Sequence, residues 1–293
     1  MQSTISRSWS DRATPWLFMA PAILLFAVYV IYPIIQSIIM SFYQWDGIGE
    51  KVFIGFQNYI DLYYDPQFWT SLWNNFLWLI FFMLAVPIGL GIALFLNQQV
   101  LGIRAVKSLF FFPFVISQVI VGIVFAWFYD PGYGLLQDIL ALFGTGPLPV
   151  LADESLVTYG IIAAGLWPQV AYTMILFLTG LNNLNPEQIE AARMDGAKGW
   201  SMLWFIIIPQ LRPATFIAVV VTVIGALRSF DLVASMTAGG PYGTSSVLAF
   251  FMYEQAIFNY RMSYGAAIAT VLFLIMLIYI AFFLWRMLKD ERG

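Results

Sequence analysis

The sequence predicts an all-α membrane protein with six transmembrane helices, and two observations support this prediction. Of its 293 residues, 61% are hydrophobic and only 10% are charged, whereas a soluble domain typically has about 25% charged residues. The scarce charges also leave six apolar stretches, and a helix needs about 20 such residues to cross a bilayer. These stretches cover residues 16–42, 72–96, 108–129, 156–181, 205–229 and 262–285.

The first stretch lies between Arg12 and Asp46. It is longer than the roughly 7–15 apolar residues of a signal peptide and lacks a convincing small-residue cleavage site. We therefore expect it to stay in the protein as a membrane span. The second stretch lies between Asp65 and Arg104 and predicts one further helix.

The third stretch is bounded by Lys107 and Asp130, and the fourth and sixth are likewise free of charge. Only 15 uncharged residues separate Arg212 from Arg228 in the fifth. That helix must include arginines near its ends, where long side chains can reach the membrane interface.

Lys and Arg are distributed unevenly between the two sides that six spans define. With a cytoplasmic N-terminus, ten of them lie inside and three outside, and cytoplasmic loops of membrane proteins are enriched in these residues. We therefore predict cytoplasmic tails at residues 1–15 and 289–293 around one transmembrane domain, residues 16–288. The inner set is Arg7, Arg12, Arg104, Lys107, Arg193, Lys198, Arg212, Arg286, Lys289 and Arg292; the outer set is Lys51, Arg228 and Arg261.

Histidine and cysteine are both absent. This excludes disulfides, thiol nucleophiles and the usual catalytic or zinc-binding sets built on these residues. The net charge of −3 gives no footprint for nucleic acid, and no Gly-x4-Gly-Lys-Ser/Thr motif is present to bind ATP. We expect no catalytic residue, no metal site and no cofactor bound by this chain.

The loop between the fourth and fifth spans, residues 182–204, contains a short and well-capped helix. Asn185 is a strong N-cap, Pro186 suits the first helical position, and Gly196 can end the helix in the left-handed conformation. Inside the helix, small alanines lie beside carboxylates, which suits close approach by another protein and one charge-assisted contact. A docking surface and a solvated connector are both compatible with this pattern.

The loop resembles the EAA loop of permease subunits of bacterial binding-protein-dependent ABC importers. The matching residues are Glu190-Ala191-Ala192, Gly196, Ile206 and Ile208-Pro209, with Ile208 where leucine is more usual. Further segments look like carbohydrate-type permeases of the MalF or UgpA type, so the resemblance covers nearly the whole chain. They are Pro21, Tyr32-Pro33, Ser41-Phe42, Trp45-Asp46-Gly47, Gly55 to Tyr59, Phe230-Asp231, Thr237 to Pro241, Tyr253, Ala256-Ile257-Phe258 and Arg261 to Ala267.

The resemblance implies a MetI-like fold and a non-catalytic subunit in the bacterial inner membrane. Such a subunit passes a carbohydrate (an oligosaccharide, glycoside or polyol derivative) from an extracytoplasmic solute-binding protein to the cytoplasm by alternating access. ATP and Mg²⁺ would bind to two separate ATP-binding subunits. A second homologous permease would complete the pathway; it is either identical or distinct, and the MalF-like features favour a heterodimer.

The resemblance also implies roles for the loop residues. Glu190, flanking the alanines together with Asp195, would pair with a basic group on the ATPase subunit. The contact surface would be Ala191, Ala192 and Ala197. Gly196 would set the turn toward the fifth span.

Polar and aromatic groups within the spans are candidates for the substrate pathway, because unpaired polar groups are costly in a bilayer. Aromatic rings stack on sugars, while amides and hydroxyls satisfy their hydroxyl groups. The fourth span offers Trp167, Gln169 and Tyr172, the fifth offers Thr222, and its outer end carries Arg228, Ser229 and Asp231. Each of these side chains could equally serve packing.

Two further points stay open at the level of sequence. Arg228 either pairs with Asp231 or meets an anionic group of the substrate. The outer segment 231–261, with its turn at Gly239-Gly240-Pro241, either lies along the membrane interface or folds back beside the bundle.

An ion-gradient-driven secondary transporter or channel is the alternative function. Such proteins commonly bury carboxylates at mid-membrane, whereas the 16 acidic residues here fall in loops or at span edges. The distribution of charge therefore favours an importer driven by the ATPase of a partner.

Overall fold

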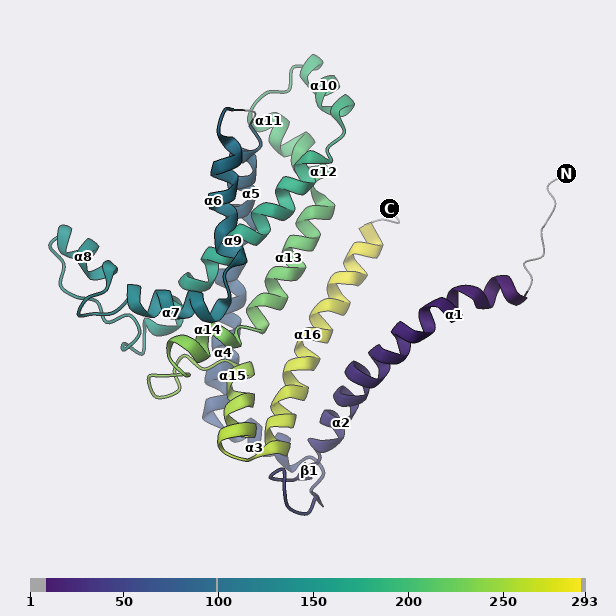
Figure 1. The fold of residues 1–293 in the computed structure, drawn as a ribbon, viewed down its shortest axis with the longest axis vertical. Coiled ribbons are helices and arrows are strands. Elements are labelled where there is room, and N and C mark those ends of the chain that lie inside the picture. Colours follow the sequence, from purple (N-terminus) through teal and green to yellow (C-terminus); the bar gives the residue numbers. More distant parts are fainter. Residues whose placement is uncertain (1–8, 99, 291–293) are drawn as a thin grey trace.

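The structure, a computed structural model, describes residues 9–98 and 100–290. The rest of the two predicted tails, residues 1–8 and 291–293, lies outside this range. The chain forms an elongated helical bundle with α10 (Pro186–Met194) at one end (Figure 1). At the other end are α3 (Gln57–Tyr64) and the short hairpin of β1 (Tyr43–Gln44) and β2 (Val52–Phe53). The hairpin pairs Tyr43 with Phe53 and Gln44 with Val52 in antiparallel register.

In the described part of the chain, all elements are helices except for one two-stranded sheet. They are α1 (Trp9–Phe26), η1 (Ala27–Ile31), α2 (Tyr32–Met40), β1 (Tyr43–Gln44), β2 (Val52–Phe53), α3 (Gln57–Tyr64), α4 (Pro66–Phe82), α5 (Ala85–Leu96), α6 (Ile103–Val115), α7 (Gln118–Phe128), α8 (Leu135–Leu142), α9 (Val157–Asn182), α10 (Pro186–Met194), α11 (Trp200–Met202), η2 (Leu203–Ile207), α12 (Ile208–Gln210), α13 (Arg212–Leu227), α14 (Phe230–Met236), α15 (Leu248–Tyr253), η3 (Glu254–Phe258) and α16 (Met262–Asp290).

Four helical segments in the described chain are long and apolar enough to cross a membrane, and two bent pairs raise the number to six if each pair is one span. The four are Thr14–Met40, Pro66–Leu96, Val157–Asn182 and Met262–Phe283. The all-α membrane class predicted from the sequence is therefore confirmed.

The third predicted span is not one straight helix, because α6 and α7 meet at 97°. Ile116 and Ser117 between them have ψ values of 137° and 138°, which is extended backbone. Ser117 and Gln118 are polar residues in the otherwise largely apolar stretch 108–129, and they stand at this break.

The fifth predicted span is bent as well, by 71° between Trp200–Gln210 and Arg212–Leu227. Pro213 has no N–H to donate to the carbonyl of Pro209 four residues earlier, so the helix is interrupted there and starts again. Leu211 at the bend is buried, with 1% of its surface exposed.

The outer segment 231–261 folds back beside the bundle, which is the second of the two alternatives left open by the sequence. It forms α14, α15 and η3, and α15 packs against α4 and α16. The side chains of Leu248, Phe250 and Phe251 are buried there.

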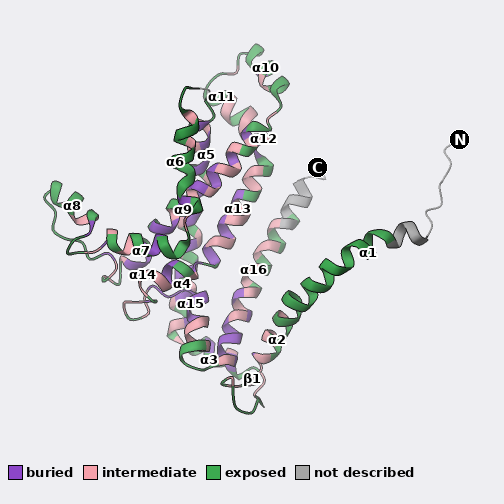
Figure 2. Cartoon of the chain, viewed as in Figure 1, coloured by how far each residue is buried: buried purple, intermediate pink, exposed green. Residues whose placement is uncertain are grey.

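The N-terminal helix stands apart from this packing. All residues from Thr14 to Pro33 are exposed, and the ribbon of α1 runs away from the bundle at an angle (Figures 1 and 2). Its continuation α2, which leads to the hairpin, packs against α16.

The close contact of α5 with α9 leaves no room for a side chain at Gly89. A Cβ atom there would overlap Thr173 Oγ1 and lie 2.8 Å from the backbone nitrogen of Met174. The Thr173 hydroxyl is itself buried and donates a 2.7 Å hydrogen bond to the carbonyl of Ala85. Gly89 therefore sets the distance between the two helices.

We expect Gly89→Ala to lower the midpoint of thermal unfolding of the detergent-solubilised protein. The added methyl group must displace backbone, and overpacking of this kind costs about 1–3 kcal/mol. Gly91→Ala on the same helix is the control, because a Cβ atom at Gly91 meets nothing within 4 Å. Equal midpoints for the two variants would contradict the close contact.

Candidate functional site

A cavity of about 370 Å³ lies where α9 and α13 meet α4, α7 and the start of α14. We call it the α9–α13 cavity. Aromatic, amide and charged side chains share its wall. Its lining is Trp78 and Phe82 of α4, Gln118 of α7, Gln169 and Tyr172 of α9, Val221, Ile224 and Gly225 of α13, and Arg228, Ser229, Asp231 and Leu232 around the turn into α14.

Five of the seven side chains predicted for the substrate pathway line this cavity: Gln169, Tyr172, Arg228, Ser229 and Asp231. A sixth, Thr222, is fully buried next to it and accepts a 2.9 Å hydrogen bond from Gln169 Nε2. This bond ties α9 to α13 within the membrane domain. It also fixes the Gln169 amide so that its oxygen, Oε1, lies beside Gly225 at the cavity wall.

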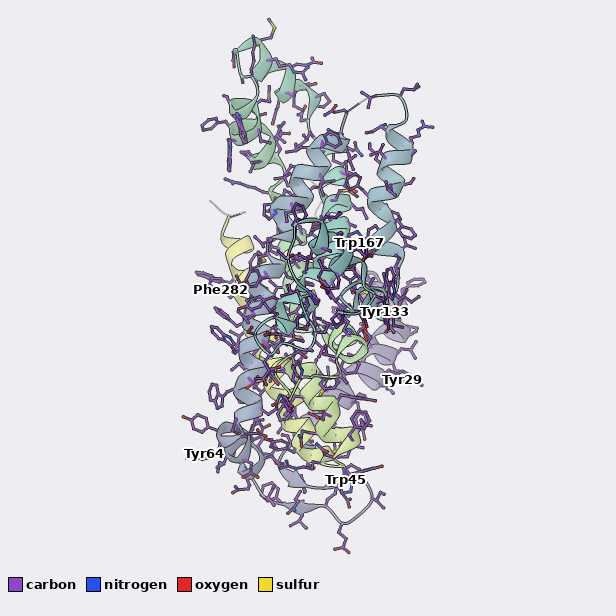
Figure 3. The ribbon with its side chains drawn as sticks, turned by 90° about the vertical axis from the view of Figure 1, so that its left-hand side faces the viewer. Tyr29, Trp45, Tyr64, Tyr133, Trp167 and Phe282 are labelled. Carbon is purple, nitrogen blue, oxygen red and sulfur yellow. The ribbon has the colours of Figure 1, made fainter. Side chains whose placement is uncertain are left out.

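The two aromatic residues of α9 that were predicted for the substrate pathway lie in different places. Tyr172 lines the cavity and stacks on Phe114 of α6, with ring centroids 4.8 Å apart and planes at 18°. Trp167 lies outside the cavity lining, 39% exposed, with its ring 5.8 Å from that of Phe125. Figure 3 shows Trp167 about midway along the molecule, with Trp45 and Tyr64 near the hairpin end.

The turn between α13 and α14 brings two opposite charges to the cavity. Arg228 and Asp231 are exposed and line it together, yet within the described residues they form no ion pair. The structure therefore does not contain the Arg228–Asp231 bridge, one of the two alternatives for this arginine. Ser229 is buried and donates a 2.9 Å hydrogen bond to the carbonyl of Ala226.

Seven lining residues were missed by the sequence reasoning: Trp78, Phe82, Gln118, Val221, Ile224, Gly225 and Leu232. Trp78 is fully buried and its Nε1–H has no acceptor in the part of the chain that the structure describes, while its ring lies 4.8 Å from that of Phe82. Their spacing of four residues places both on one face of α4. Gln118 is the first residue of α7, and an amide inside the apolar stretch 108–129 was the available clue.

The short helix of the loop 182–204 forms as predicted. Asn185 Oδ1 accepts a 2.9 Å hydrogen bond from the backbone N–H of Glu187, and Pro186 is the first residue of α10. Gly196 ends the turn with φ +89°, a left-handed conformation that disfavours other residues. The helix stands at the end of the molecule opposite the hairpin (Figure 1).

The residues of α10 and of the turn after it differ in exposure. Glu190, Ala191, Asp195 and Gly196 are exposed, and Ala197 is half-buried. Ala192, expected on the contact surface, is only 6% exposed and faces inward. Large apolar side chains of the loop and of the residue that follows it are also exposed: Met194, Trp200, Trp204 and Phe205.

Among the described residues, no group of three or more Asp, Glu, His or Cys side chains could hold a metal ion.

Comparison with known proteins identifies the class. Residues 4–291 match the family of binding-protein-dependent transport system inner membrane components. The chain belongs to this family of ABC transporter permeases, which are non-catalytic translocation components, and it is a multi-pass membrane protein.

A probable ABC transporter permease of Pyrococcus horikoshii is 35% identical over 279 residues, 94% of this chain and 96% of that protein. The arabinooligosaccharides transport system permease AraP of Bacillus subtilis is 32% identical over 274 residues, 92% and 87% of the two chains. A chain in the structure of a bacterial alginate ABC transporter, in complex with alginate pentasaccharide-bound periplasmic protein, aligns with a TM-score of 0.81 at 23% identity. It covers 95% of this chain and 96% of that one and confirms the fold.

Proposed function

We propose that this chain is the translocation subunit of an ATP-driven carbohydrate importer and that the α9–α13 cavity receives the sugar in transit. The supporting observation is one cavity that combines aromatic rings with amide, hydroxyl and charged groups between membrane helices. Rings such as Tyr172 suit the apolar faces of sugars, and groups such as Gln169 suit their hydroxyls. The similarity to an arabinooligosaccharide permease supports this substrate class.

The exposed face of α10 is the proposed contact with the ATPase subunit, through Glu190, Ala191 and Asp195. ATP and Mg²⁺ bind to two such partner subunits, and Gly196 sets the turn that carries the motion onward. The 16 residues of α13 then span about 24 Å from the bend at Leu211 to the cavity. One helix thus connects the bend in the fifth span with the cavity, and α11, η2 and α12 connect that bend with α10, which suits alternating access by rigid-body motion.

A second homologous permease is the proposed membrane partner, in a heterodimer. The separation of α1 from the bundle leaves apolar residues, for example Phe18 at 83% and Leu17 at 72% exposed, open to a membrane partner of either kind (Figure 2), and the MalF-like features favour a distinct one. An extracytoplasmic solute-binding protein delivers the substrate at the hairpin end. In the bacterial inner membrane, α10 and both chain termini then face the cytoplasm.

The function is tested by purifying the chain with its second permease, ATPase subunits and binding protein, and reconstituting the complex in proteoliposomes. We expect ATP hydrolysis to rise when the sugar-loaded binding protein is added, together with sugar uptake. Uptake that follows an ion gradient and needs no ATP would refute the proposal and favour the secondary transporter.

We expect Arg228→Gln to reduce uptake of an anionic sugar much more than uptake of a neutral one. Arg228 lines the cavity without an ion pair to Asp231, so its charge is available to a substrate. Losing a hydrogen bond to a charged group costs about 1.5–3 kcal/mol, which is roughly 10- to 100-fold. Competition of neutral and uronic-acid oligosaccharides for uptake measures the ratio, and equal effects on both would exclude this role.

A further inference from the structure

A single hydrogen bond joins the α10 segment to the bend in the fifth span. The backbone N–H of Asn185 donates to Gln210 Oε1 at 3.1 Å. In the described chain, no other hydrogen bond links residues 185–197 to the rest of the molecule. The position of α10 relative to the membrane helices therefore depends on this contact and on its packing against η2 and α11.

Asn185 takes part in two hydrogen bonds, one to α10 and one to Gln210. Its side chain caps α10 through Glu187, while its backbone N–H points to Gln210. The next residue, Pro186, has no N–H to offer. A shift of the start of α10 is consequently passed to Gln210 through one residue.

Gln210 is the last residue of α12 and directly precedes Leu211 at the 71° bend. Leu211 is buried among Phe177, Leu181 and Ala218, in the cluster where α9 and α13 pack together. From there α13 leads to the Gln169–Thr222 hydrogen bond and the cavity. Gln210 thus stands between the docking helix and the helix that lines the cavity.

The amide of Gln210 uses only one of its two polar atoms. Oε1 accepts the bond from Asn185, while Nε2 is buried without any acceptor among the described residues. An unsatisfied buried donor is unfavourable, so the hydrogen bonding that holds this side chain comes from Oε1 alone. The chemistry required at this position is an acceptor oxygen.

We propose that Gln210 is a positioning residue that couples α10 to α13, so that movement of the docked helix turns the bend of the fifth span. This inference rests on the proposed function. Its distinguishing feature is that the acceptor oxygen carries the coupling and the amide nitrogen does not contribute.

The test uses the reconstituted complex with Gln210→Leu and Gln210→Glu. Leucine removes the acceptor, and we expect about a fivefold smaller stimulation by loaded binding protein, the factor that corresponds to one hydrogen bond. Basal ATP hydrolysis should stay unchanged. Glutamate keeps the acceptor oxygen and adds a negative charge near the start of α10, where the helix dipole favours it and partly offsets the cost of burying the second oxygen, so stimulation should clearly exceed that of Gln210→Leu.

Gln98→Leu is the matched control, because Gln98 is an exposed glutamine in the loop after α5 and has no hydrogen bond within the described residues. Normal stimulation in Gln210→Leu, or equal loss in the leucine and glutamate variants, would overturn the assignment. Hydrogen exchange of the peptide covering residues 185–195 is a second measurement. Exchange of this peptide should accelerate only in Gln210→Leu, and unchanged exchange would overturn the link between α10 and Gln210. This measurement needs no ATP hydrolysis, so it tests the link even if the wild-type complex is not stimulated and the proposed function fails.

Discussion

Glu190→Lys is expected to abolish the stimulation of ATP hydrolysis by loaded binding protein while the protein remains in the membrane. Glu190 is an exposed carboxylate on α10 beside the exposed Ala191. Replacing it with lysine places like charges together at the proposed contact with a basic group of the ATPase, and such pairs are strongly disfavoured at interfaces. Hydrolysis by the purified complex, with and without loaded binding protein, measures the effect.

Glu154→Lys is the matched control for this charge reversal. Glu154 is also exposed but precedes α9, at the end of that helix remote from α10. Its variant should be stimulated like the wild type. If Glu190→Lys were stimulated normally as well, the docking assignment of α10 would fail.

Gly196→Asp tests the turn after the helix in the same assay. The φ of +89° at Gly196 disfavours a side chain, and the new carboxylate adds charge beside Asp195. We expect loss of stimulation here too, with the chain still present in the membrane fraction.

Gly225→Trp is expected to reduce sugar uptake more than tenfold by filling the α9–α13 cavity. A Cβ atom at Gly225 would lie 3.4 Å from Gln169 Oε1 and 3.9 Å from the ring of Phe82, so the new side chain projects into the proposed path. Uptake of radiolabelled sugar into proteoliposomes measures the loss. Basal ATP hydrolysis should be retained, because the site of docking on α10 is untouched.

Gly91→Trp is the control for the bulk of the new side chain. Gly91 is exposed on α5, and a Cβ atom there meets nothing within 4 Å. We expect near-normal uptake. Normal uptake in Gly225→Trp would show that the sugar does not pass through this cavity.

Features that depend on neighbouring residues could be predicted from the sequence. The capped helix α10 is an example, because Asn185, Pro186 and Gly196 specify its start and end within a dozen residues. The apolar stretches are a second example, since the bilayer requires the same composition of any spanning helix. The family resemblance, drawn from the spacing of the EAA loop, is confirmed by the match over residues 4–291.

The cavity could be predicted only in part. Gln169, Tyr172 and Arg228 were found because polar groups are conspicuous in apolar spans, but Trp78 and Phe82 resemble their apolar neighbours in α4. Their role depends on α4 facing α9 and α13. The inward face of Ala192 is a similar case, since both faces of α10 carry small or polar residues.

By itself, the sequence determined that the chain is an all-α membrane protein of the permease family with a capped helix in the loop 182–204. Charge content, cap residues and motif spacing are local properties of the sequence, so they do not depend on how the helices pack together. Only the tertiary structure decided the bends at residues 116–117 and 211, the cavity lining, and the contact of Gln210 with Asn185. Those features arise because helices distant in sequence pack together, and a uniformly apolar segment does not encode which of its faces meets which neighbour.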